Sequence, residues 1–369
     1  MMINPADISV VVQGTNIKKQ TDKCLRSIRK YLPGATIIFS TYENTNVADL
    51  DYDVLVRSPD PGAEKMTPKW SNNTNRILVT SNAGLAYVKT KYVIRMRSDM
   101  IFANSKILND IASQFPKRDK KYSVFKKRVL FYALFSRYQE TVHTSLILER
   151  PFDISDWFCF GLTTDVKDYF NCPLTDEPGF TYYFHGKNIF ANIVGCASWQ
   201  YPVEQWICMN FFSKYFPAAK MQDSFDYDEN RIDLSRKLLA NNMVIVDYKN
   251  IGVYIQKKSY KHLSKIIHKK NLFGKYGKYG ELSSWIHGVY THQVFLSDYQ
   301  KYCDSTFQLA TDNKQILILE HFYKHVYFFV RPFMNLLNIR VWLGDFISIF
   351  WYAGKYLIYS FTKTKNDAK

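Results

Sequence analysis

The alternation of buried strands and amphipathic helices over the first hundred residues constrains the fold of this chain more than any other feature. The run ISVVVQG at 8–14 is apolar up to its polar end, as expected of a strand that is buried on both faces. A helical pattern follows at 19–32, and Pro33-Gly34 ends it. The same reasoning predicts further strands at 36–41, 52–58 and 92–98 and a second helix at 73–90. Strands separated by helices at this spacing predict an α/β fold, with a mostly parallel, Rossmann-like sheet flanked by helices.

The carboxyl ends of these strands are where a ligand is expected, because ligands of parallel sheets bind beyond that edge. All four predicted strands end in polar or turn-forming residues, at 13–15, 40–43, 58–62 and 97–99. No GxGxxG follows the first strand, which argues against a dinucleotide site, and the sequence has no GxxxxGK[ST], which excludes a P-loop. The expected ligand is therefore bound by a different arrangement of side chains.

The stretch KYVIRMRSDMIF places three charges on one face of the fourth strand, Arg95, Arg97 and Asp99, because residues two apart share a face. A carboxylate at a strand end suits Mg²⁺ or Mn²⁺, which take one or two carboxylates and phosphate oxygens. Arg97 beside it could hold a diphosphate directly. The structural alternative is that these arginines pair with Asp99 or another acid and close a core.

Seven separated stretches resemble, in this order, the WavE lipopolysaccharide synthesis family of bacterial surface-polysaccharide proteins. They are ISVVVQG, CLRSIRKYLPGATIIFSTYE, LDYDVLVRSPDPG, NNTNRILVTSNAGL, KYVIRMRSDM, FDISDWFCFGL and PVEQW, and they span about residues 7–260. The stretch KYVIRMRSDM also resembles the Asp-X-Asp element of GT-A glycosyltransferases, with Arg97 in place of the first Asp. The resemblance implies a GT-A-like glycosyltransferase that uses a nucleotide-sugar donor and a divalent metal, Mn²⁺ or Mg²⁺, at Asp99. The arginine replacement leaves open whether the metal is dispensable.

The donor is then expected across the ends of the first strands. Gly14 lets a ligand approach the backbone, and Asn73 and Arg76 stand at a predicted helix start, where phosphate is favoured. Two of these features also have purely structural readings, since Asp60-Pro61-Gly62 is a turn motif and Asn73 is a suitable helix cap. The expected donor-binding residues are Gln13, Gly14, Thr41, Glu43, Asp60, Asn73, Arg76, Arg97 and Ser98.

Two acids are the candidates for the base that an inverting sugar transfer requires. Glu204 follows Pro202 at a predicted helix start, about 100 residues after Asp99, which resembles the place of the base in GT-A enzymes. Asp156 has an aromatic neighbour, Trp157, that could stack on a sugar ring. The alternatives are a helix N-terminal charge for Glu204 and a capping role for Asp156.

The C-terminal region differs in character from the rest. The stretch 257–278 is strongly basic, and the last fifty residues are apolar and aromatic, but no run there reaches the 18–20 clean residues of a membrane span. Amphipathic helices that lie on an anionic membrane fit this composition and the net charge of +16. We expect a glycosyltransferase domain at 1–260, with a nucleotide-binding half at 1–115 and an acceptor half at 116–260. We expect a helical, aromatic, basic, membrane-associating region at 261–369.

The compartment is expected to be the cytoplasm. Six widely spaced cysteines without a CxxC pair favour free thiols over a zinc site, and the N-terminal apolar run is too short for a signal peptide. The sequence thus predicts a peripheral enzyme at the inner face of the bacterial membrane.

The predicted function is transfer of a sugar from a nucleotide donor to a lipopolysaccharide or capsular polysaccharide acceptor, which is a glycan or a lipid-linked saccharide. One alternative is a sugar nucleotidyltransferase, although QGTNIKKQTDK lacks the Gly-rich, Arg-containing loop of those enzymes. A second alternative is a non-catalytic scaffold that binds nucleotide sugars. The positive charge also suits nucleic acid, but no nucleic-acid-binding module is recognisable, so no nucleic-acid partner is expected.

Overall fold

The computed structural model describes residues 2–67, 70–141, 147–185, 198–256 and 289–309. All four strands and both helices predicted in the first hundred residues are present, with ends shifted by four residues at most. They are β1 (Ile8–Gln13), α1 (Lys19–Tyr31), β2 (Thr36–Tyr42), β3 (Val54–Ser58), α2 (Thr74–Ala86) and β6 (Tyr92–Arg97).

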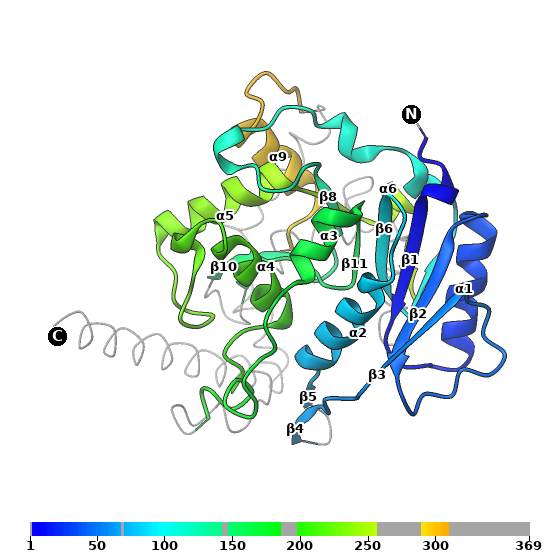
Figure 1. The fold of residues 1–369 in the computed structure, drawn as a ribbon. Coiled ribbons are helices and arrows are strands. Elements are labelled where there is room, and N and C mark those ends of the chain that lie inside the picture. The colour runs from blue at the N-terminus through cyan, green and yellow to red at the C-terminus, as the bar shows by residue number, and fades with distance from the viewer. Residues whose placement is uncertain (1, 68–69, 142–146, 186–197, 257–288, 310–369) are drawn as a thin grey trace, which may run out of the picture.

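A seven-stranded sheet forms the centre of the described chain (Figure 1). Its strand order is β12-β8-β11-β6-β1-β2-β3. The three strands from the second half of the chain are β8 (Val129–Tyr132), β11 (Phe158–Leu162) and β12 (Met243–Val246). The pairs β6–β1, β1–β2, β2–β3 and β12–β8 are parallel, whereas β11 runs antiparallel to both of its neighbours. The predicted α/β fold with a mostly parallel sheet is therefore confirmed.

Two helices cover the first half of the sheet. The connections through α1 and α2 cross the sheet in opposite directions, so right-handed crossovers place these helices on opposite faces. Gly84 shows how closely α2 packs: a Cβ there would lie 2.6 Å from Val11 Cγ1 and 2.8 Å from Ser40 Cβ. This close packing brings the start of α2 to the carboxyl ends of β1 and β2.

The second half of the described chain adds helices around β8, β11 and β12, and two-stranded sheets and short 3₁₀ helices from both halves lie outside the central sheet. The helices are α3 (Thr163–Phe170), α4 (Val203–Ser213), α5 (Glu229–Asn242), α6 (Tyr248–Ile251) and α9 (His292–Tyr302). The two-stranded sheets pair β4 (Glu64–Thr67) with β5 (Trp70–Asn72), β7 (Met100–Phe102) with β13 (Val253–Ile255), and β9 (Arg137–Thr141) with β10 (Ile147–Asp153). Short 3₁₀ helices lie at η1 (Pro5–Asp7), η2 (Lys106–Leu108), η3 (Ile111–Gln114), η4 (Lys120–Tyr122) and η6 (Pro217–Ala219).

The helix α9 packs against α5 and β12, and Figure 1 shows α5 and α9 together at the end of the molecule away from β3. A bidentate ion pair joins Arg236 on α5 to Asp298 on α9, with N–O distances of 2.5 and 2.7 Å. The described residues 289–309 are thus part of the packed structure. The remainder of the predicted C-terminal region, 261–288 and 310–369, lies outside the described residues, and the domain division at 260 stays a prediction.

The described helices include none that is both long and apolar enough to cross a bilayer. The five cysteines in the described residues are free thiols, and four of them are buried.

Candidate functional site

The carboxyl ends of β2, β1 and β6 are joined by backbone hydrogen bonds. The Gly14 N–H donates to Ser40 O at 3.0 Å, and the Ser98 N–H donates to Gln13 O at 3.1 Å. Gly14 has φ of +116°, a conformation that favours glycine, and a Cβ there would lie 3.4 Å from Ser98 Oγ. The hydroxyl of Ser98 donates to Thr15 O at 2.9 Å. Three of the predicted donor-binding residues, Gln13, Gly14 and Ser98, are therefore fixed relative to one another.

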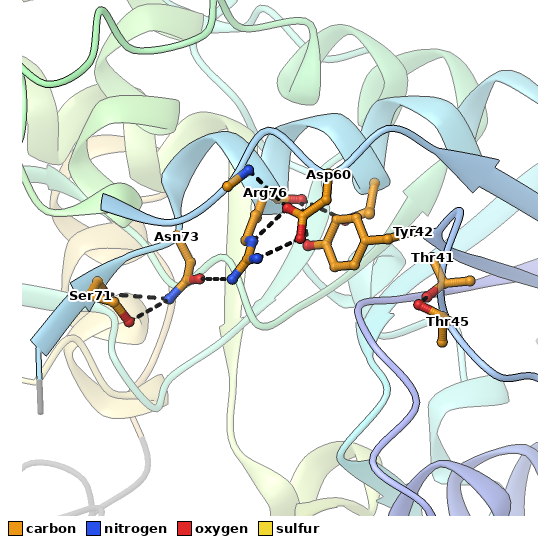
Figure 2. A network of polar contacts seen from close by, with 9 residues as sticks. Thr41, Tyr42, Thr45, Asp60, Ser71, Asn73 and Arg76 are labelled. Atoms are coloured by element: carbon orange, nitrogen blue, oxygen red, sulfur yellow. Dashed lines mark hydrogen bonds and ion pairs between the residues drawn. The ribbon is translucent and has the colours of Figure 1, made fainter. Parts of the chain in front are cut away.

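A polar network connects the end of β3 to the start of α2 (Figure 2). Arg76 donates from Nε to Asp60 Oδ1 at 2.7 Å and from Nη1 to Asn73 Oδ1 at 3.3 Å. The Arg76 hydrogen bonds hold the pKa of the Asp60 carboxyl below its usual range. Figure 2 shows Tyr42 beside this pair, and the guanidinium of Arg76 lies 5.6 Å from the centre of its ring. The predicted donor residues Asp60, Asn73 and Arg76 thus form one cluster.

This cluster is connected to the end of β1. The Thr80 hydroxyl lies 2.8 Å from Gln13 Oε1 and 2.8 Å from Arg76 O, one helical turn before it. Asn73 is the residue that precedes α2, but its side chain makes no capping bond; Asn72 Oδ1 accepts from the Thr74 N–H instead, at 2.9 Å. The helix-cap reading of Asn73 is therefore wrong, while its role toward a donor stays a prediction.

Two further predicted donor residues follow β2. The Thr41 hydroxyl donates to the Thr45 hydroxyl at 2.8 Å, as Figure 2 shows, so it is engaged with its own loop. Glu43 is exposed, and its N–H donates to Ser58 O at 3.0 Å, which ties the ends of β2 and β3 together. These positions lie at the predicted edge of the sheet.

Arg97, the last residue of β6, contacts two neighbouring side chains, Asp99 and Trp157. Arg97 donates to both carboxylate oxygens of Asp99, each at 2.9 Å. Its guanidinium also lies 4.2 Å from the centre of the Trp157 ring, at a distance typical of cation–π contacts. Asp99 is almost fully buried, with 1% of its side chain exposed, whereas Arg97 is 20% exposed. Arg97 is therefore the charged group of this pair that a ligand can reach.

This arrangement, as it stands, does not fit a resident metal ion. The resemblance implies Mn²⁺ or Mg²⁺ at Asp99, but a cation would have to displace the Arg97 guanidinium from both carboxylate oxygens. Within the described ranges no group of three His, Cys, Asp or Glu side chains is placed to hold a metal ion. The guanidinium itself carries the positive charge and the paired donors that a diphosphate needs.

A second charged pair lies beneath this edge. Because β11 runs antiparallel to β6, with Phe158 opposite Met96, Asp156 lies beside the end of β6. Asp156 Oδ2 is 3.9 Å from Nη1 of Arg95, and both side chains are buried. Arg95 donates from Nε to Ser81 Oγ at 3.0 Å, but neither its Nη atoms nor the Asp156 oxygens have a hydrogen-bond partner within the described residues. Burial lowers the pKa of Arg95.

The other candidate base lies at the start of α4. Glu204 Oε2 is 3.9 Å from Nη2 of Arg137, which also lies 3.0 Å from Asp153 Oδ2. Gln205 donates to Pro151 O at 2.9 Å and so fixes the first turn of α4 to β10. Burial, together with the negative charge of Asp156, raises the pKa of Glu204 to about 8.

The structure thus gathers most of the predicted residues into two groups, whereas Gly14, Thr41, Glu43 and Ser98 belong to neither. One contains Gln13, Asp60, Asn73 and Arg76, and the other contains Arg95, Arg97, Asp99, Asp156 and Glu204. Sequence reasoning missed Arg137 and Asp153. Asp153 lies in the stretch FDISDWFCFGL, three residues before Asp156, and could have been considered as a candidate from the sequence. No local pattern indicates that Arg137 contacts two distant acids.

Two later segments of the described chain reach the second group and its neighbour Arg137. The Gln256 N–H donates to Asp99 O at 2.9 Å, and Val289 forms an antiparallel bridge with Arg137.

Comparison with known proteins gives one finding. A family model described as WavE lipopolysaccharide synthesis matches residues 8–323. A search of curated proteins gave no match to this chain. The matched residues include both groups of the candidate site and most of the chain, so this protein belongs to the WavE lipopolysaccharide synthesis family.

Proposed function

We propose that this protein is a glycosyltransferase that moves a sugar from a nucleotide donor to a lipopolysaccharide or capsular polysaccharide acceptor. The proposal depends on two observations: the partly exposed Arg97 is held by Asp99 at the end of β6, and the buried acids Asp156 and Glu204 lie near that strand end. A diphosphate leaving group needs a fixed cation, and an acceptor hydroxyl needs a base. Family membership supports a role in lipopolysaccharide synthesis.

The roles follow from the positions. Arg97, oriented by Asp99 and Trp157, would hold the donor diphosphate. The nucleoside would lie toward Gln13 and Gly14. The acceptor oxygen would attack the anomeric carbon, the bond from that carbon to the diphosphate oxygen would break, and the hydroxyl proton would pass to Glu204.

A role for divalent metal at Asp99 stays a prediction. The ion pair with Arg97 favours donor binding that does not need a metal, because an added cation would compete with the guanidinium for the same two oxygens. The membrane-face location also stays a proposal. It rests on the net charge of +16 and on the basic and aromatic segments of the C-terminal sequence.

The proposal is tested by calorimetric titration of the purified protein with UDP, GDP, CDP and CMP, with and without Mn²⁺. We expect one nucleotide to bind in the absence of metal and to be lost in Arg97→Ala. The control is Arg26→Ala, which removes an exposed arginine on α1 that pairs with Asp22. Binding that requires Mn²⁺ and is lost in Asp99→Ala would instead restore the metal site. If none of the four nucleotides binds, the transferase proposal fails.

Product analysis distinguishes the proposed transferase from the two alternatives, a non-catalytic scaffold and a sugar nucleotidyltransferase. Hydrolysis or transfer of the donor sugar that is lost in Glu204→Gln excludes a non-catalytic scaffold. Release of pyrophosphate from a nucleoside triphosphate identifies a nucleotidyltransferase.

A further inference from the structure

The loop that follows β8 places an aromatic side chain, Phe135, at the same edge of the sheet as Arg97. The strand β11 runs antiparallel to both β6 and β8, so β6 and β8 point the same way and their carboxyl ends lie at one edge. The backbone turns over 133–136, where the Ser136 N–H donates to Ala133 O at 2.9 Å. Phe135 occupies the third position of this four-residue turn.

Phe135 has a backbone conformation that a bulky side chain rarely adopts. Its φ is +68°, in the left-handed region where the third position of a turn favours glycine or asparagine. Residues held in this region persist where the surrounding structure enforces them, and they gather at functional sites. A phenylalanine at a position that suits glycine therefore indicates a role for the ring itself.

The ring of Phe135 stacks on the indole that contacts Arg97. The centres of the Phe135 and Trp157 rings are 4.5 Å apart and their planes differ by 28°, which is a favourable geometry for an aromatic pair. The same indole lies 4.2 Å from the guanidinium of Arg97. The orientation of the indole at the guanidinium therefore depends in part on the ring of Phe135.

Hydrogen bonds fix the two backbone segments that carry these rings. The Ser136 hydroxyl donates to Tyr132 O at 2.7 Å and accepts from the Ser155 N–H at 3.0 Å. The Trp157 N–H donates to Ser155 Oγ at 3.3 Å. Both serines are fully buried. The segments next to Phe135 and Trp157 are thus joined to each other, and the stacked pair is preorganised.

We propose that Phe135 is a positioning residue that acts on Arg97 through Trp157. Its ring keeps the indole in the orientation that contacts the guanidinium, and so keeps Arg97 in place for the donor diphosphate. All three side chains make other contacts as well, so loss of the ring should weaken this arrangement without abolishing it. The consequence for donor binding rests on the proposed function, whereas the effect on Arg97 itself does not.

Two substitutions separate the ring of Phe135 from its turn. Phe135→Gly suits the positive φ but removes the ring, whereas Phe135→Tyr keeps the ring at the same φ. A role in the turn alone predicts that the glycine variant behaves like the parent protein. A role in positioning predicts that only the tyrosine variant does. The matched control is Phe216→Ala, which removes a half-buried ring stacked on Tyr122 at 6.1 Å.

The first measurement is NMR of the full-length protein labelled with ¹⁵N-arginine. The Nε–H of Arg97, which donates to Asp99, gives a signal that Arg97→Lys identifies by its loss. Its chemical shift depends on the orientation of the indole, because an aromatic ring alters the magnetic field at nearby nuclei. We expect the signal to move in Phe135→Gly and to keep its parent position in Phe135→Tyr and Phe216→Ala. An unchanged signal in Phe135→Gly, or an equal movement in Phe135→Tyr, overturns the proposal.

The second measurement is calorimetric titration with whichever of UDP, GDP, CDP and CMP binds the parent protein. Phe135→Gly should lower the affinity by about twofold to fivefold, the range that a cation–π contact contributes, and Phe135→Tyr should restore it. Equal affinity in Phe135→Gly and the parent protein overturns the role in donor binding. If the Arg97 signal moves as expected but no nucleotide binds the parent protein, the positioning of Arg97 stands and the proposed function fails alone.

Discussion

Replacing Glu204 by glutamine should make the protein more stable, and the gain should grow with pH. Burial and Asp156 raise the pKa of Glu204 from the ordinary 4.5 to about 8. Between these two values the unfolded chain releases the proton while the folded protein keeps it. The folded protein therefore binds more protons, and the free energy of unfolding falls as pH rises through this window. Glutamine stays neutral in both states and removes that loss.

The magnitude follows from the size of the pKa change. Each pH unit inside the window is worth about 1.4 kcal/mol. The advantage of Glu204→Gln over the parent protein should thus grow by roughly 2 kcal/mol from pH 6 to pH 8, and should level off near 5 kcal/mol above that pH.

Urea denaturation at a series of pH values measures this difference. The urea dependence of the free energy should be the same in both proteins, so the difference appears in the midpoints. Asp168→Asn, at a surface ion pair with Lys214, should show a difference from the parent that does not change between pH 6 and pH 8. A constant difference for Glu204→Gln as well would refute the raised pKa of Glu204 in the folded protein.

Three further predictions concern separate parts of the molecule. Gly14→Ala should destabilise the protein by about 1–2 kcal/mol, because φ is +116° at this position, and should weaken nucleotide binding; urea denaturation and calorimetry check the two effects. Asp298→Asn should cost about 3 kcal/mol, since it leaves Arg236 without its bidentate partner between α5 and α9; thermal unfolding of the variant would show a drop in midpoint, and an unchanged midpoint would contradict a structural role for the pair. Deletion of 316–369 should move the protein to the soluble fraction of a cell lysate; retention in membranes after a high-salt wash would disprove an anchor in this segment.

Much of the first half of the fold was predictable because its signals are local. The continuous apolar run at 8–13, the turn at Pro33-Gly34 and the apolar face of 74–86 each lie within one element. The direction of β11 was not predictable in this way. Its sequence, FCFGL, is compatible with either direction, and its antiparallel place between β6 and β8 depends on how distant segments pair.

The site shows the same division. The sequence placed Arg97 and Asp99 close together, and the two side chains do pair, although β6 ends at Arg97 and Asp99 lies in the turn that follows it. It could not show that Arg76 would bind Asp60, which lies 16 residues earlier and beyond a two-stranded sheet. Nor could it show that Arg137 would lie between Asp153 and Glu204.

The sequence by itself therefore determined the class of fold, the edge of the sheet where a ligand is expected, and the family resemblance, because each depends on short patterns of apolar, turn-forming and charged residues. Tertiary structure decided which charges meet and how deeply each is buried. Those two quantities set the proton affinity of Glu204 and the accessibility of Arg97, since both depend on the distance to other charges and to water.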